Sequence, residues 1–164
     1  MIDLNQLVYR NVYGMEDFRD RMRSILVSIL QDPVVSLLLE RSSITKQQLS
    51  ALIVDVISEN LTDRNLTYED KAKCMLKPIS KGAYNRSLIQ ARQNVTKSFF
   101  TILLLSYIGL LEDSEISKLM ELGGKLRSII EMYRREGIDR SEVSKAITRL
   151  AELIEKYIDH HRYR

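Results

Sequence analysis

Residues 71–111 read KAKCMLKPISKGAYNRSLIQARQNVTKSFFTILLLSYIGLL and join two different kinds of sequence. The first 28 residues are rich in basic and amide side chains, and the last 13 are almost entirely apolar. The whole stretch carries seven basic residues and no acidic residue, although the full chain has a net charge of only +3. The rest of the chain therefore sums to −4, so the positive potential is concentrated here.

The spacing of apolar residues predicts one long helix through this stretch. Ser80 is a good N-cap, and the positions that follow repeat at steps of three and four. They are Tyr84, Leu88, Ala91, Val95, Phe99 and Ile102. We expect Tyr84 to point inward with this stripe. Beyond Ser98 the sequence is apolar almost all round, which predicts that residues 99–111 are buried at the centre of the fold.

Capping signals place the helices that come before this stretch. We expect helices from Met15 to about Gln31, from Asp32–Pro33 to Arg41, from Thr45 to about Asn60, and from Thr67 to Met75. Thr45 with Gln48 is a capping box, and Thr67 with Asp70 has the same spacing. Residues 2–13 fit either a short helix or a strand.

The sequence after residue 112 predicts two further helices, over 114–136 and 142–157, that form a hairpin. The second has an apolar seam at steps of four and three, which favours pairing with a second copy of the chain. The predicted dimerisation residues are Val143, Ile147, Leu150, Ile154 and Tyr157. The same seam would also fit packing within one chain.

Six glycines and two prolines in 164 residues, together with helical periodicity throughout, predict an all-α protein. We expect a helical bundle over residues 1–112, with a helix-turn-helix-like segment at 67–98, and the C-terminal hairpin over 113–164. The two parts could equally form one domain.

The composition also points to a compartment. The single cysteine, Cys74, cannot form an internal disulfide and is expected to be a buried or half-buried thiol. No apolar run reaches the roughly 20 residues that span a bilayer. These features favour a cytoplasmic protein that does not enter the membrane.

A short capped helix, a turn containing Pro78 and a second helix with a polar outer face match the helix-turn-helix plan for binding double-stranded DNA. Lysine and arginine neutralise phosphates, a helix start offers N–H groups to a phosphate, and Asn, Gln and Arg can read base edges. The predicted nucleic-acid-binding residues are Lys71, Lys73, Lys77, Ser80, Lys81, Gly82, Asn85, Arg86, Gln90, Arg92, Gln93 and Lys97.

The function expected from these features is that of a homodimeric transcriptional regulator or chromatin-associated factor. The alternative is a helical adaptor in a larger assembly without a nucleic-acid role, and RNA binding comes third because no aromatic stacking platform is evident.

No catalytic motif is present, and we expect neither an enzyme nor a cofactor. Asp55 and Glu59 are paired carboxylates that we expect to face solvent. His160 and His161 have no ligand partner at helical spacing, so we expect no metal site there.

Overall fold

The computed structural model describes residues 15–61 and 66–111, with separate positions between 117 and 152. The continuous parts form five helices, α1 (Met15–Leu30), α2 (Pro33–Glu40), α3 (Lys46–Leu61), α4 (Tyr68–Lys73) and α5 (Lys81–Tyr107), and contain no strand. This confirms the all-α class for the described part of the chain. The predictions for residues 2–13, for the hairpin and for His160 and His161 lie outside the described residues.

Local capping decides where four of the helices begin, as predicted. Asp32 accepts hydrogen bonds from the N–H groups of Val34 (2.9 Å) and Val35 (3.3 Å) at the start of α2. At α3 the capping box forms in both directions, with the Gln48 N–H bonded to Thr45 Oγ1 and the Thr45 N–H bonded to Gln48 Oε1.

The helices α4 and α5 are capped in the same way. The Asp70 N–H donates to Thr67 Oγ1, and the Ala83 N–H donates to Ser80 Oγ, both at 3.2 Å. Each cap satisfies a backbone donor that would otherwise lack a partner in the first turn of its helix. The start of each of these two helices is therefore set by residues only three positions apart in the sequence.

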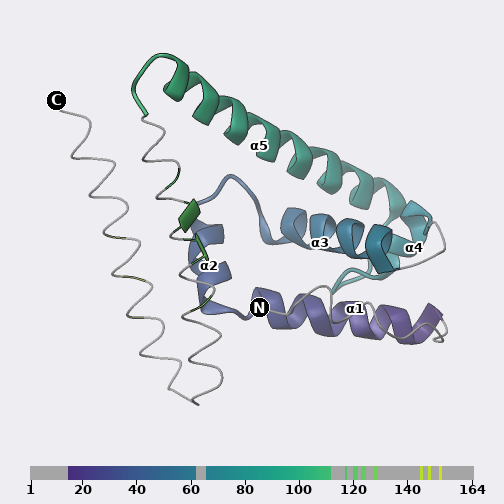
Figure 1. Ribbon diagram of the computed structural model, residues 1–164. Helices are drawn as coiled ribbons and strands as arrows, with labels where there is room; N and C mark the ends of the chain where they lie inside the picture. The colour runs from purple at the N-terminus through teal and green to yellow at the C-terminus, as the bar shows by residue number, and fades with distance from the viewer. Residues whose placement is uncertain are drawn as a thin grey trace.

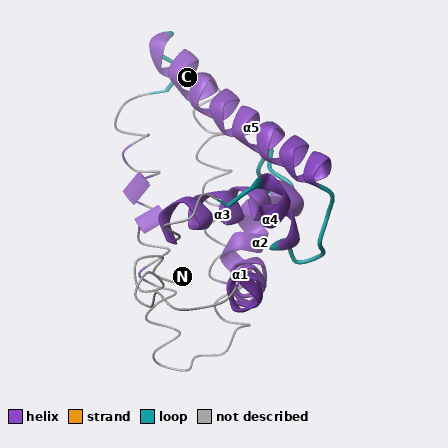
Figure 2. Cartoon of the chain, turned by 90° about the vertical axis from the view of Figure 1, so that its right-hand side faces the viewer, coloured by secondary structure: helices purple, strands orange, loops and turns teal. Residues whose placement is uncertain are grey.

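The core lies between α1, α3, α4 and the first half of α5. Figures 1 and 2 show α5 on one side of the molecule and α1 on the opposite side, with α3 and α4 between them. The buried side chains of this core include Met22, Ile25, Leu26, Ala51, Val54, Ile57, Ala72, Cys74, Met75, Tyr84 and Leu88. Burial of these side chains supplies the main driving force for the arrangement.

The prediction that residues 99–111 form the buried centre is wrong. Phe100 is 67% exposed and Leu104 is 58% exposed, whereas Tyr84 and Leu88, which lie 12 to 20 positions earlier on the same helix, are fully buried. The reason is length: α5 has 27 residues and α3 has 16, so at about 1.5 Å per residue α5 extends well past its main support. Figure 1 shows this projecting end.

The helix α5 ends at Tyr107 in a turn that needs glycine. Gly109 has φ +74°, its N–H donates to Ser106 O at 3.0 Å, and the Leu110 N–H donates to Leu105 O at 2.9 Å. A left-handed residue just after the helix is the usual way to satisfy its last carbonyls, and glycine adopts it without strain.

Among the described residues, no helix alone has the length and apolar content required to cross a membrane. The pair Glu16–Leu30 and Pro33–Glu40 meets the requirement only when taken together, with a 71° bend between the two helices.

Candidate nucleic-acid interface

The segment between α4 and α5 is a compact turn over residues 74–80. It starts slightly earlier than predicted, because α4 ends at Lys73 and the Cys74 N–H closes it by donating to Asp70 O at 3.2 Å. The Ile79 N–H donates back to Ala72 O at 3.3 Å, and Cys74 and Met75 are buried in the core. The turn is thus fixed to the bundle at both ends, which holds the start of α5 in a defined position.

The inner side of α4 is also tied to α1. Arg23 Nη2 donates to the backbone oxygen of Lys73 at 3.1 Å, so a cation satisfies a carbonyl at the C-terminal end of α4. Arg19 of α1 and Asp70 of α4 form an ion pair at 3.8 Å. Together these contacts connect the first helix to the segment that precedes the candidate interface.

The outer face of α5 carries four of the predicted residues on one stripe. Its members are Arg86, Gln90, Gln93 and Lys97, and all four are exposed. The steps of four, three and four place them on one side of the helix, while Tyr84, Leu88 and Ala91 on the other side are buried. None of the four side chains has a hydrogen-bond or ion-pair partner among the described residues. We call these four residues the polar stripe.

The start of α5 is open to solvent beside this stripe. Ser80, Lys81 and Gly82 are exposed, and a Cβ atom added to Gly82 would meet no atom within 4 Å. The first N–H groups of a helix lack internal partners and carry partial positive charge. This end of α5 therefore has the backbone geometry and the lysine that suit an anion.

The remaining predicted residues at this end differ in solvent exposure and in whether they already have a hydrogen-bond partner. Lys77 is exposed in the turn, and Asn85 is half-buried. Lys73 is exposed but donates to Glu69 Oε1 at 2.8 Å, and this bond lowers the pKa of the Glu69 carboxyl. An anionic ligand would have to compete with Glu69 for the Lys73 ammonium.

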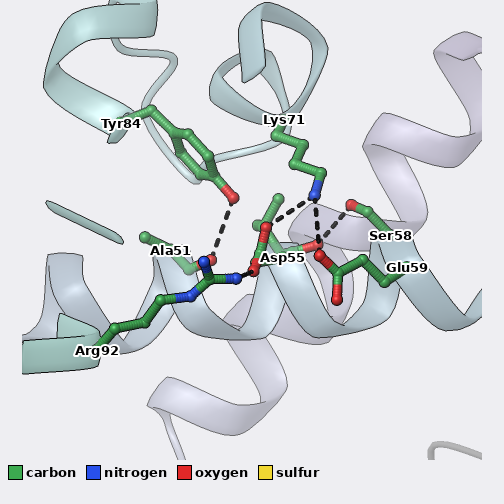
Figure 3. A network of polar contacts seen from close by, with 8 residues as sticks. Ala51, Asp55, Ser58, Glu59, Lys71, Tyr84 and Arg92 are labelled. Atoms are coloured by element: carbon green, nitrogen blue, oxygen red, sulfur yellow. Dashed lines mark hydrogen bonds and ion pairs between the residues drawn. The ribbon is translucent and has the colours of Figure 1, made fainter. Parts of the chain in front are cut away.

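Lys71 and Arg92 are placed differently from the other predicted residues, because both meet Asp55 (Figure 3). Lys71 Nζ lies 2.7 Å from Asp55 Oδ1, with the two side chains 7% and 4% exposed. Arg92 Nη2 lies 2.5 Å from Asp55 Oδ2, and its side chain is 55% exposed. We call these three residues the charged cluster. Lys71 is used inside the fold, and only Arg92 of the two keeps an accessible surface.

The prediction that Asp55 faces solvent is wrong. The spacing of apolar residues in α3 suggests an inner face that includes Leu52, Ile53 and Val56. Val56, however, is 44% exposed, and the residues that are buried on α3 include Ala51, Val54 and Asp55. Asp55 meets Lys71 of α4 and Arg92 of α5. Glu59 is exposed, as predicted, with its carboxylate 3.8 Å from Lys71 Nζ.

The buried carboxylate is stable here because both of its oxygens are paired. A buried charge without a partner is strongly unfavourable, whereas two hydrogen-bonded cations offset its desolvation. The absence of acidic residues from 71–111 is the signal that could have revealed this buried carboxylate. A cation of that stretch that packs into the core needs an acidic partner, and the partner has to come from another part of the chain. Asp55 is that partner, 16 positions from Lys71 and 37 from Arg92.

Tyr84 completes the connection between α5 and α3. Its inward orientation was predicted correctly, and its hydroxyl donates to the backbone oxygen of Ala51 at 3.2 Å (Figure 3). Burial, followed by the charge of Asp55, raises the pKa of the Tyr84 hydroxyl. The hydroxyl therefore remains a hydrogen-bond donor at neutral pH.

Cys74 is buried, as predicted. Burial raises the pKa of its thiol, so the reactive thiolate is disfavoured and the residue acts as a small apolar side chain. In the described part of the chain, no three His, Cys, Asp or Glu side chains lie close enough together to hold a metal ion.

Comparison of the chain with protein-family models, with curated proteins and with solved structures found no match. In its described residues the chain is an all-α protein with an exposed basic and amide helix face, and this helix is joined to the core by a charged cluster around the buried carboxylate of Asp55.

Proposed function

We propose that this chain binds double-stranded DNA through α4, the turn at 74–80 and the first half of α5, and that it acts as a dimeric transcriptional regulator or chromatin-associated factor. The observation that supports this is the polar stripe. Four exposed side chains able to contact phosphates or bases lie on one helix face, and within the described part of the chain none of them has a partner.

The dimensions of the stripe suit a groove of DNA. Arg86 and Lys97 are 11 positions apart, which is about 16 Å along a helix. That length covers about five base pairs at 3.4 Å each. Arg86 can donate two hydrogen bonds to guanine, and Gln90 and Gln93 can pair with adenine.

Phosphate contacts are proposed for the residues around the start of α5. Lys77 and Lys81 are exposed cations on either side of Ser80, and the helix N-terminus adds its N–H groups. Such contacts set the position of a protein on the duplex without reading sequence. Lys71 is not included, because its ammonium is buried against Asp55.

The charged cluster has a supporting role in this proposal. Asp55 on α3 links to Lys71 on α4 and Arg92 on α5, so one carboxylate ties together the two helices that would face the duplex. A binding face held by rigid elements loses less conformational entropy on association.

We propose that the protein acts in the cytoplasm and has no catalytic role. Its chemistry is the neutralisation of phosphate charge and hydrogen bonding to bases, neither of which requires a nucleophile or a cofactor.

The test is fluorescence anisotropy of a labelled random duplex at two salt concentrations. We expect binding that weakens steeply with salt, and loss of most of it in the double variant Arg86→Ala, Lys97→Ala. The matched control is Lys46→Ala, Lys145→Ala, which also removes two positive charges, from exposed positions outside the acid-free stretch. No binding at low salt, or equal loss in the control, would contradict the proposal.

A helical adaptor is the second candidate, and a specific observation favours it. Residues 99–104 of α5 expose several large apolar side chains, a property of surfaces that associate with other proteins. In the same assay an adaptor without a nucleic-acid role would give no salt-dependent binding at all.

A further inference from the structure

One large apolar side chain borders the polar stripe at its middle. Ile89 is 47% exposed, and across residues 81–98, all of which the structure describes, it is the only large apolar side chain exposed to this degree. Side chains three and four positions apart are neighbours on a helix surface. The neighbours of Ile89 at these spacings include Arg86 and Gln93, which are exposed members of the polar stripe.

The stability of α5 gives no reason for an isoleucine at this position. An exposed β-branched side chain favours a helix less than the arginine and glutamine residues that surround it. The core accounts for Leu88 and Ala91, which are buried, but it leaves about half of Ile89 in contact with water. Apolar area in water is unfavourable until a partner covers it.

We infer that Ile89 contacts the C5-methyl group of a thymine in the major groove, and that this contact selects A·T pairs at the middle of the polar stripe. The inference rests on the proposed binding of double-stranded DNA. The thymine methyl is the apolar group that a base pair presents in the major groove, and apolar side chains recognise it by direct contact. An apolar side chain among hydrogen-bonding ones therefore fits this groove.

The neighbouring Gln93 fits the same base pairs. A glutamine amide can bond to both N6 and N7 of adenine, whose partner thymine carries its methyl group in the same groove. Ile89 and Gln93 are four positions apart on α5, so their Cβ atoms are separated by about 6 Å. That distance is less than two base-pair steps of about 3.4 Å. One turn of α5 can thus read an adenine by hydrogen bonds and a nearby thymine by an apolar contact.

The contact also distinguishes thymine from uracil. Uracil pairs with adenine in the same way and differs from thymine only in lacking the C5-methyl group. Replacing thymine by deoxyuridine in a duplex therefore removes the partner of Ile89 and leaves the phosphates and the hydrogen-bonding groups of the bases in place. This replacement isolates the role of Ile89 from that of the polar stripe.

Fluorescence anisotropy with two labelled duplexes tests the inference. Both duplexes have the same A·T-rich sequence, and one of them carries deoxyuridine at every thymine position. We expect the wild-type chain to bind the thymine duplex about fourfold more tightly for each methyl group in contact, which is the effect of burying one group of this size. Ile89→Ala should bind the two duplexes equally.

The matched control is Val27→Ala. Val27 is a 40% exposed β-branched residue on α1, which lies on the opposite side of the molecule from α5 (Figure 1). This variant should keep the wild-type preference for the thymine duplex. Both substituted side chains are exposed, so both variants are expected to keep the helical circular dichroism of the wild type.

Two results would overturn the inference. The first is equal, salt-dependent binding of the two duplexes by the wild-type chain, which would leave the proposed function intact. The second is a preference for thymine that persists in Ile89→Ala, because it would then come from the shape of the duplex and not from the methyl contact. Absence of binding to either duplex at low salt would contradict the proposed function, and the inference with it.

Discussion

The two halves of α5 belong to one helix and have opposite surroundings. Residues 81–97 pack one side on α3 and α4 and expose the polar stripe, whereas residues 99–110, which we call the apolar end, expose large hydrophobic side chains beyond the core. The difference shows that apolar content alone does not decide burial. A residue is buried only where another element reaches it, and α3 supports only the first half.

The largest effect is expected at the anchor of the first half. Asp55→Ala removes the partner of Lys71 and leaves a buried ammonium, which should lower the free energy of unfolding by about 3–5 kcal/mol. Urea denaturation followed by circular dichroism measures this. Glu59→Ala, which removes an exposed carboxylate 3.8 Å from the same ammonium, should cost less than about 1 kcal/mol. Similar losses in the two variants would mean that the charged cluster does not anchor α5.

A matched pair of leucines compares the two halves directly. Leu88→Ala empties a fully buried site and should cost about 2–5 kcal/mol. Leu104→Ala alters a 58% exposed site and should change the stability of the monomer by no more than about 0.5 kcal/mol. Urea titrations at low protein concentration, where association is minimal, measure both. A large loss for Leu104→Ala under those conditions would show that the apolar end packs within its own chain.

The smallest effect is a loss of stability at alkaline pH. The pKa values of Cys74 and Tyr84 are raised in the folded chain above their ordinary values of 9.0 and 10.0. The unfolded chain therefore releases these protons first, so the stabilisation is complete below about pH 9 and is lost as the pH rises further.

Urea midpoints at pH 7 and pH 10.5 measure this loss. Tyr84→Phe should show a shallower decline than the wild type, because one of the two titrating groups is absent. An identical decline in the variant would mean that Tyr84 ionises as readily in the folded chain as in the unfolded one.

The helix starts were predictable from sequence because their causes are local. The caps at Asp32, Thr45, Thr67 and Ser80 each bond to a group two or three residues away. The inward position of Tyr84 followed in the same way from periodicity within one helix. Such features depend on neighbours that can be read directly from the chain.

The sites of Asp55 and Lys71 could not be found in this way. Local spacing made Asp55 an exposed acid and Lys71 a phosphate contact, and the structure pairs them across two helices. The polar stripe was predicted as a group, since its residues share one face of one helix. Its accessibility, however, depends on which side of α5 the other helices cover.

The sequence by itself determined the all-α class, the helix starts and the acid-free basic face, because propensity, capping and charge act between near neighbours in the chain. Only the tertiary structure decided which cations remain available and which apolar residues are buried. Both depend on contacts between distant segments: Asp55 meets Arg92 from 37 positions away, and the apolar end of α5 extends past the shorter helix that supports its start.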